Sequence, residues 1–247
     1  MPKVYLSPST QEGNLTITGG TEEYYANLIA DAIIPYLEAS GIEYGRNTPD
    51  MTALSSAQQA NAGNYDFYLA IHSNASAKPY AGRVRGAEVY YYPGSANGLR
   101  AATIFANNYK EIYPMPEFVQ IIPSEILVEL NKTKMPAILF ETAYHDNQED
   151  FQWLSSNINN IGRNFAISVA DYFGMPFIEP DAFASGVVTL NNGTLNIRRG
   201  PSTNAEIAGS LNNGDIVKIL ESENGWYRIR YGDTTGYVDV RFIRALT

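Results

Sequence analysis

Residues 67–76 read FYLAIHSNAS, and the first five of them form an unbroken apolar run. Such a run between polar segments is typical of a central strand in a sheet that helices cover on both faces. His72 follows the run, at the carboxyl end of the predicted strand. Functional sites of open α/β sheets lie beyond these ends, so His72 is the first candidate site residue.

Predicted strands and helices alternate on both sides of this run. The strand-like segments are 3–7, 86–92 and 136–144, and the helix-like segments are 21–41, 51–63, 96–113 and 159–174. Thr21 is the predicted N-cap of the first helix, whose apolar residues recur at helical spacing. The alternation predicts an α/β domain over residues 1–176, with an open, mostly parallel sheet flanked by helices.

The pattern of the sequence changes towards the C-terminus. Residues 177–185 predict a linker, and residues 186–247 consist of short strand-like runs separated by tight-turn signals. Asn-Gly pairs at 192–193 and 213–214 are typical of such turns. We expect a second domain here, a small all-β barrel.

Charge and composition exclude several classes of protein. The 247 residues carry a formal net charge of −9, whereas a nucleic-acid-binding protein needs a basic surface. No apolar run approaches the ~20 residues that cross a bilayer, so we expect no membrane insertion. No signal peptide is visible after Met1. The sequence has no cysteine, which excludes disulfides and thiolate chemistry.

Two carboxylates join His72 as candidates for chemistry. Glu141 interrupts the apolar strand PAILFETAY, where a buried carboxylate is costly unless it is paired or binds a metal. Glu23 lies in the first turn of the first long helix, where an acid also complements the helix dipole. A lone strand histidine is often structural, but one imidazole with two carboxylates is the donor set of a catalytic zinc site.

The first 175 residues or so resemble the zinc-dependent N-acetylmuramoyl-L-alanine amidases. Three segments are similar to motifs of that family, in the same order: TEEYYANLIA (21–30), LAIHSNAS (69–76) and MPAILFETAYHDN (135–147). The resemblance implies that Glu23 and His72 bind Zn²⁺ and that Glu141 is the catalytic carboxylate. It also implies a peptidoglycan hydrolase that cleaves the amide bond between N-acetylmuramic acid and L-alanine of the stem peptide.

The stretch VYLSPSTQEGN, residues 4–14, departs from the family pattern. The family's first strand ends in Asp-Pro-Gly-His-Gly, whose histidine is the remaining zinc ligand, and Thr10 falls on it in an ungapped alignment. A threonine hydroxyl is a poor ligand, whereas Gln11 offers an amide oxygen and Glu12 a carboxylate. Thr10, Gln11 and Glu12 are thus all candidates to replace the missing histidine. Our predicted set of metal ligands is Glu23, His72 and Gln11. His145 is a further candidate for the metal or for substrate.

The C-terminal segment resembles bacterial SH3-like cell-wall-binding domains, through LNIRRGPSTNAEIAGSL (195–211) and GWYRIRYGDTTGYVDVRFI (225–243). These domains commonly bind peptidoglycan. The two resemblances imply an extracellular or cell-wall enzyme, with phage-type release or a non-standard export route because no leader is visible. The alternative is an inactive or metal-free wall-binding protein on the amidase fold.

Overall fold

A computed structural model describes residues 1–180, 185–223, 225–232 and 234–246. The chain forms two compact units, Met1–Pro180 and Asp181–Thr247. Residues 181–184, which belong to the predicted linker 177–185, lie outside the described residues.

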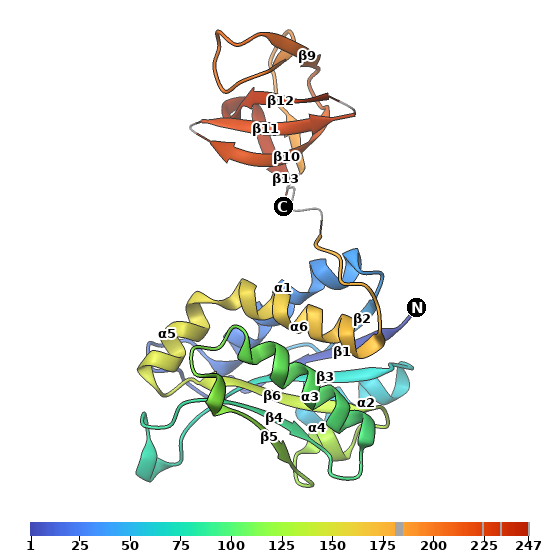
Figure 1. The fold of residues 1–247 in the computed structure, drawn as a ribbon, viewed down its shortest axis with the longest axis vertical. Coiled ribbons are helices and arrows are strands. Elements are labelled where there is room, and N and C mark those ends of the chain that lie inside the picture. Colours follow the sequence, from blue (N-terminus) through green and yellow to red (C-terminus); the bar gives the residue numbers. More distant parts are fainter. Residues whose placement is uncertain (181–184, 224, 233, 247) are drawn as a thin grey trace. The chain divides into compact units, whose positions relative to one another are not determined.

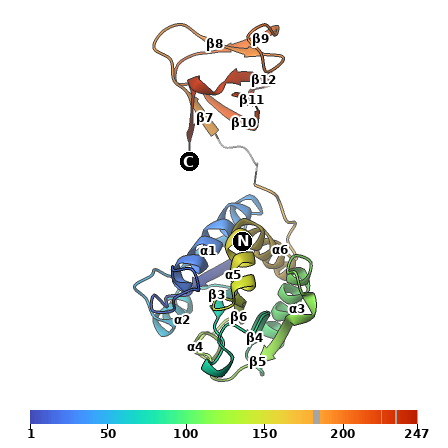
Figure 2. The same cartoon turned by 90° about the vertical axis from the view of Figure 1, so that its left-hand side faces the viewer.

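The first unit is a six-stranded sheet with helices on both faces (Figures 1 and 2). Its strands are β1 (Lys3–Pro8), β2 (Glu43–Arg46), β3 (Phe67–Asn74), β4 (Ala87–Tyr91), β5 (Val119–Pro123) and β6 (Ala137–Tyr144). Its α-helices are α1 (Glu22–Ala39), α2 (Ala53–Ala62), α3 (Ala96–Lys110), α4 (Val128–Asn131), α5 (Gln148–Ser156) and α6 (Ile158–Phe173).

The strands run in the order β2-β1-β3-β6-β4-β5. All neighbouring pairs are parallel except β4 and β6, which are antiparallel, so the predicted mostly parallel α/β sheet is confirmed. The apolar run that begins at Phe67 belongs to β3, which lies between β1 and β6. Seven of the eight residues of β3 are buried. Its carboxyl end therefore lies beside the carboxyl ends of β1 and β6.

Alternation along the strands divides the core of the first unit into two layers. Leu6 and Leu69 point to the face that α1, α3 and α6 cover, and Tyr5 and Tyr68 point to the face of α2 and α4. The rings of Tyr5 and Tyr68 stack with their centroids 5.2 Å apart. The second face thus carries tyrosine hydroxyls, of which that of Tyr68 donates to Glu129 of α4.

The N-terminus of α1 is fixed against the loop that follows β1. Thr21 caps the helix, as predicted, because its Oγ1 accepts a hydrogen bond from the Tyr24 N–H at 3.1 Å. The Glu22 N–H donates to the carbonyl of Asn14 at 2.9 Å. The first turn of α1 is therefore held at the carboxyl end of the sheet.

The second unit is a seven-stranded antiparallel sheet in the order β13-β7-β10-β11-β12-β8-β9. Its strands are β7 (Ser185–Val188), β8 (Leu195–Arg198), β9 (Ile207–Leu211), β10 (Ile216–Glu223), β11 (Trp226–Tyr231), β12 (Thr234–Asp239) and β13 (Ile243–Leu246). Gly193 and Gly214 of the predicted turns have positive φ angles of 75° and 89°, which glycine adopts without a steric cost. The all-β prediction for this part of the chain is confirmed.

The beginning of the predicted linker packs on the first unit. The ring of Phe177 stacks on Tyr36 of α1 with a centroid distance of 5.7 Å. The Ile178 N–H donates to Ser40 Oγ at 3.0 Å, just beyond the end of α1. These residues extend the first unit past the end of α6.

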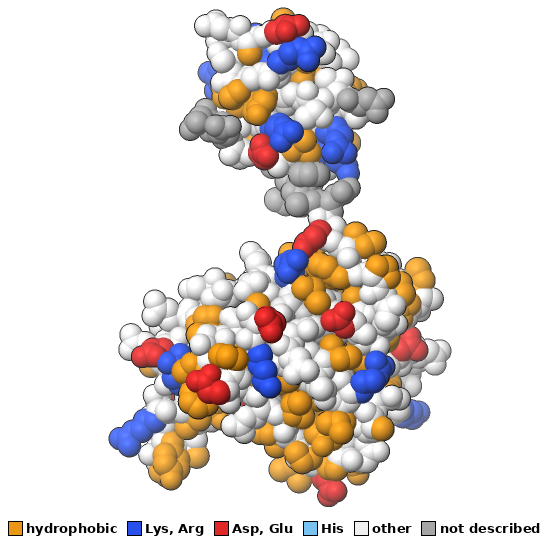
Figure 3. Space-filling model, in the orientation of Figure 1, with side chains coloured by type: hydrophobic (Ala, Val, Ile, Leu, Met, Phe, Trp, Pro, Cys, Tyr) orange, Lys and Arg blue, Asp and Glu red, His pale blue; other side chains and the backbone are white. Residues whose placement is uncertain are grey.

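Acidic and basic side chains are interspersed on the face of the first unit that Figure 3 shows. No basic stripe of the kind that follows a nucleic-acid backbone crosses this face among the described residues. Within the described parts of the chain, no helix is long and apolar enough to span a membrane.

The contact between α1 and α6 depends on Gly162. A Cβ at this position would lie 2.5 Å from the Cβ of Ala32, closer than two non-bonded carbon atoms can approach. We predict that Gly162→Ala pushes the two helices apart and lowers the free energy of unfolding by about 1–3 kcal/mol. Urea unfolding measures this change. Asn160→Ala, on the exposed side of the same helix, is the control, and an equal effect of both substitutions would contradict the account.

Candidate active site

The imidazole of His72 lies between two buried carboxylates. Its Nδ1 is 2.8 Å from Glu22 Oε1 and its Nε2 is 2.9 Å from Glu129 Oε2. Glu22 is the first residue of α1, and Glu129 lies on the short helix α4. The three side chains therefore come from three elements that meet at the carboxyl end of β3.

The protonation of His72 follows from these partners. An ionised carboxylate only accepts hydrogen bonds, so the ring must donate from both nitrogens to satisfy both partners. Burial alone lowers the pKa of His72, but the hydrogen bonds to Glu129 and Glu22 outweigh it and hold the pKa well above its usual value. Burial raises the pKa of Glu22, but the hydrogen bond and charge of His72 together with the hydrogen bond from Asn14 outweigh this effect and lower the pKa. Both ring nitrogens of His72 therefore face a carboxyl group.

Glu129 is itself held by two hydroxyl groups. Ser7 Oγ donates to Glu129 Oε1 at 2.6 Å, and the Tyr68 hydroxyl lies 2.8 Å from the same oxygen. Asn47 Nδ2 donates to Ser7 Oγ at 3.3 Å and so orients the hydroxyl from behind. The carboxylate has a partner at each oxygen, and its position is fixed from β1 and β3.

Glu141 lies beside His72, on the neighbouring strand. The two residues are register partners of β6 and β3. Glu141 Oε2 is buried and has no hydrogen-bond partner among the residues that the structure describes. Burial raises the pKa of Glu141 to about 8, and the nearby carboxylates of Glu22 and Glu88 add to the shift while His72 opposes it. A carboxyl group in this state is suited to exchange a proton near neutral pH.

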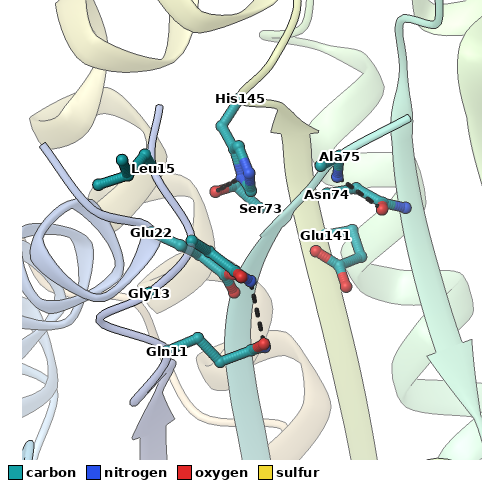
Figure 4. Close-up of a pocket in the computed structure, with 10 residues that line it drawn as sticks. Gln11, Gly13, Leu15, Glu22, Ser73, Asn74, Ala75, Glu141 and His145 are labelled. Atoms are coloured by element: carbon teal, nitrogen blue, oxygen red, sulfur yellow. Dashed lines mark hydrogen bonds between the residues drawn. The ribbon is translucent and has the colours of Figure 1, made fainter. Parts of the chain in front are cut away.

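Glu22 and Glu141 line one pocket of about 450 Å³ at the end of the sheet (Figure 4). Gln11 lies at its rim, and its Oε1 accepts a hydrogen bond from Asn14 Nδ2 at 2.9 Å. Thr10 is absent from this pocket and lines the adjacent one, on the side of Glu129. Glu12 lines neither of these two pockets and is exposed. Of the three open replacements for the missing histidine, Gln11 alone reaches the space beside Glu22 and Glu141.

The glutamate of α1 that faces His72 is Glu22, one residue before the predicted Glu23. Glu23 is absent from the pocket, and its Oε1 accepts a hydrogen bond from Asn27 Nδ2, one turn further along α1. Adjacent helix positions point about 100° apart, so only one of the two glutamates can face β3. Asn14 selects Glu22, because its Nδ2 donates to Glu22 Oε2 at 2.6 Å. The structure thus places Glu22, and not the predicted Glu23, in the pocket, and which of the two binds a metal stays a prediction.

His145 lies in the same pocket, at the turn after β6. Its Nδ1 is 2.9 Å from Ser73 Oγ, and its backbone carbonyl accepts a hydrogen bond from the Ile17 N–H at 3.1 Å. Its hydrogen-bond partner is thus Ser73 and not a residue of the Glu22–His72–Glu129 cluster. His145, the second histidine of the chain, is therefore a lining residue of the pocket.

The residues present fit a divalent cation. Among the described residues no group of three or more His, Cys, Asp or Glu side chains is already arranged around a metal position. The chemistry of the set nevertheless suits zinc, since an imidazole and carboxylates are ligands that this ion accepts. The buried, unpartnered Glu141 oxygen beside Glu22 also leaves room for a positive charge or a bound water. Glu129, which sequence reasoning missed, adds a third carboxylate to the expected pair.

Comparisons with known proteins assign the two parts of the chain to two protein families. Residues 9–171 match the family model described as N-acetylmuramoyl-L-alanine amidase, and residues 193–244 match the one described as bacterial SH3 domain. The two family resemblances noted in the sequence are thereby confirmed.

Curated relatives match parts of the chain. The N-acetylmuramoyl-L-alanine amidase CwlM of Bacillus licheniformis is 33% identical over 134 residues, which are 52% of this chain and 49% of that protein. Bacteriocin BCN5 of Clostridium perfringens is 33% identical over 70 residues, 28% of this chain and 8% of the bacteriocin. The chain thus spans about half or less of the length of these relatives.

A solved structure shares the fold of the first unit. The N-acetylmuramoyl-L-alanine amidase AmiC2 of Nostoc punctiforme superposes with a TM-score of 0.61 at 21% identity. The superposition covers 70% of this chain and 97% of that structure. At this identity the likeness concerns the fold.

The raised pKa of Glu141 predicts a pH-dependent cost to stability. Its carboxyl ionises near pH 4.5 in the unfolded chain and at about 8 in the folded one, so folding becomes less favourable as the pH rises through this range. Glu141→Gln removes this cost. At pH 8 we expect the variant to be more stable than the parent protein by on the order of 3 kcal/mol, a figure reduced because the Glu141 side chain is partly exposed to solvent. At pH 4.5 we expect the two proteins to be nearly equal in stability.

Urea unfolding of the chelator-treated protein measures this effect. A Trp226→Phe background leaves Trp153, in α5, as the single tryptophan that reports on the first unit. Glu117→Gln, at an exposed position, is the control. A Glu141→Gln difference that does not change with pH would contradict the assignment.

Proposed function

The chain belongs to the N-acetylmuramoyl-L-alanine amidase family, and from this premise we propose that it hydrolyses the amide bond between N-acetylmuramic acid and L-alanine of peptidoglycan. The observation that carries the proposal is the position of Glu141. Glu141 lines the pocket that Glu22 also lines, beside the strand of His72, and its buried Oε2 has no hydrogen-bond partner among the described residues. An amide hydrolase needs a proton acceptor at such a place.

We propose Zn²⁺ as the cofactor, held by Glu22 and by Nδ1 of His72. Their donor atoms lie 2.8 Å apart and face one another, so the two side chains would hold the ion between them. Gln11, at the pocket rim, is the candidate for a further contact, directly or through water. Bound zinc supplies a Lewis acid that polarises the amide carbonyl and lowers the pKa of water.

The residues of the chain then carry the proton transfers. Glu141 accepts a proton from the water whose oxygen adds to the lactyl carbonyl carbon of muramic acid. Glu141 returns this proton to the alanine nitrogen as the carbon–nitrogen bond breaks, so that a carboxylic acid and a free amine leave. His72 changes its role on zinc binding, because the proton on Nδ1 must leave before that nitrogen can bind a metal.

We further propose that the second unit binds peptidoglycan and keeps the first unit on its insoluble substrate. The bacterial SH3 match over residues 193–244 supports this role. Attachment raises the local concentration of the enzyme at the wall without any new contact at the active site. The site of action is then the bacterial cell wall or the exterior of the cell.

The activity is tested on purified Gram-positive cell walls. We expect new N-terminal alanine to appear in step with muramic acid that lacks a peptide, to stop with a chelator and to return with zinc. We expect Glu141→Gln to lower the rate by roughly 10²–10⁴-fold, because it removes the proton acceptor. Release of any other N-terminal residue would indicate a different peptidoglycan bond. Walls that are bound but not cut by zinc-loaded protein would contradict the proposal and favour a wall-binding protein.

Glu22 and Glu23 form a matched pair for testing the metal site. We expect Glu22→Gln to weaken zinc binding about 10–100-fold, because it removes a charged ligand, and Glu23→Gln to leave it within about twofold. Competition with a chromophoric chelator measures both affinities. The reverse ranking would show that α1 presents Glu23 to the metal, as the family motif alone implies.

A further inference from the structure

Glu129 has no place in the motif resemblance and has no part in the proton transfers. It is nevertheless buried, and it holds the Nε2 side of His72 at 2.9 Å. From the geometry we infer that Glu129 is a positioning residue, which keeps the proton on His72 Nε2 and thereby directs Nδ1 towards the metal site beside Glu22. This inference rests on the proposed zinc-dependent function.

The first support is the rigid setting of the Glu129 carboxylate. Its Oε1 receives the Ser7 and Tyr68 hydroxyls at 2.6 and 2.8 Å, which leaves Oε2 directed at His72. The backbone carbonyl of Glu129 also accepts a hydrogen bond from Thr133 Oγ1 at 3.0 Å. A carboxylate fixed in this way imposes an orientation on the ring that it binds.

The second support is the division of space around the ring. Glu22 and the unpartnered Glu141 line the pocket of about 450 Å³, whereas Glu129 lines the adjacent pocket of about 210 Å³ together with His72 and Ser7. The proton acceptor of the proposed reaction thus shares a pocket with Glu22, the partner of Nδ1, and not with Glu129. A metal on the Glu129 side would contact Nε2 and would lie in the pocket that Glu141 does not line.

The third support is the chemistry of histidine as a ligand. A metal-bound imidazole commonly donates its other N–H to a carboxylate, which fixes the tautomer and makes the ring a stronger ligand. The Glu129–His72 pair has this form, with Nε2–H as the donor and Nδ1 as the nitrogen that faces Glu22. We expect the stronger binding of zinc by His72 to compensate in part for the missing histidine ligand in the turn after β1.

The test combines zinc affinity with nuclear magnetic resonance of the full chain. The chain has only two histidines, so a long-range ¹H–¹⁵N spectrum contains two imidazole patterns, and His145→Asn assigns them. In the zinc-loaded protein we expect His72 to carry a proton on Nε2 and the metal on Nδ1. Metal on Nε2 would overturn the inference while leaving the zinc-dependent function intact.

The variants are Glu129→Gln, Glu129→Asp and, as a control, Glu125→Gln at an exposed position four residues earlier. We expect Glu129→Gln to weaken zinc binding about 10–100-fold and to shift the Nε2–H resonance of His72. We expect Glu129→Asp, which keeps the charge, to recover part of the affinity, and Glu125→Gln to match the parent protein. Parental affinity in Glu129→Gln would refute the positioning role.

Two further measurements keep the inference separate from folding and from the proposed function. If Glu129→Gln does not fold, Ser7→Ala removes one hydrogen bond from the carboxylate and should give a smaller loss of zinc affinity with an unchanged circular dichroism spectrum. An unchanged affinity in a folded Ser7→Ala protein would again refute it. Failure of the parent protein itself to bind zinc would instead refute the proposed function.

Discussion

The imidazole of His72 joins the two sides of the site, because its ring nitrogens bind carboxylates from two different helices. Three ionisable side chains can share a buried position only if their charges compensate one another and every polar atom has a partner. The fold meets this requirement by ending β3 between the first turn of α1 and the short helix α4. The cap at Thr21, the loop contact of Asn14 and the hydroxyls behind Glu129 all serve this arrangement.

Glu141 is the exception within this compensated cluster. Its Oε2 has no partner in the described part of the chain, and burial raises the pKa of Glu141 to about 8. A buried group without a partner costs stability, and such costs are concentrated at functional sites. The contrast between a satisfied Glu129 and an unsatisfied Glu141 therefore separates a positioning carboxylate from a chemical one.

The sequence predicted those features that depend on strand ends and on local signals. The apolar run of β3 placed His72 at the carboxyl edge of the sheet, and the polar interruption of β6 singled out Glu141. The sequence did not distinguish Glu22 from Glu23, because this choice depends on the rotation of α1 about its axis, which Asn14 fixes through a tertiary contact. Helix periodicity alone cannot resolve one residue in the first turn.

Glu129 could not be predicted for a related reason. It lies on a four-residue helix whose existence depends on packing against the sheet, and the edge strand β5 before it has only five residues. Both elements are too short to produce a periodic signal. A buried glutamate shortly before a strand can be recognised only when its partners, Ser7 and Tyr68, are known from strands far away in the sequence.

The central claim is that His72 is the only histidine ligand of the proposed zinc, which Glu22 also binds and which Gln11 contacts at the place of the missing histidine. X-ray absorption at the zinc edge of the loaded protein tests it most directly. We predict nitrogen and oxygen ligands at about 2.0–2.2 Å with outer-shell scattering from one imidazole per zinc. Two imidazoles per zinc would show that His145 enters the site, and none would show that His72 keeps both of its carboxylate partners; either result would contradict the account.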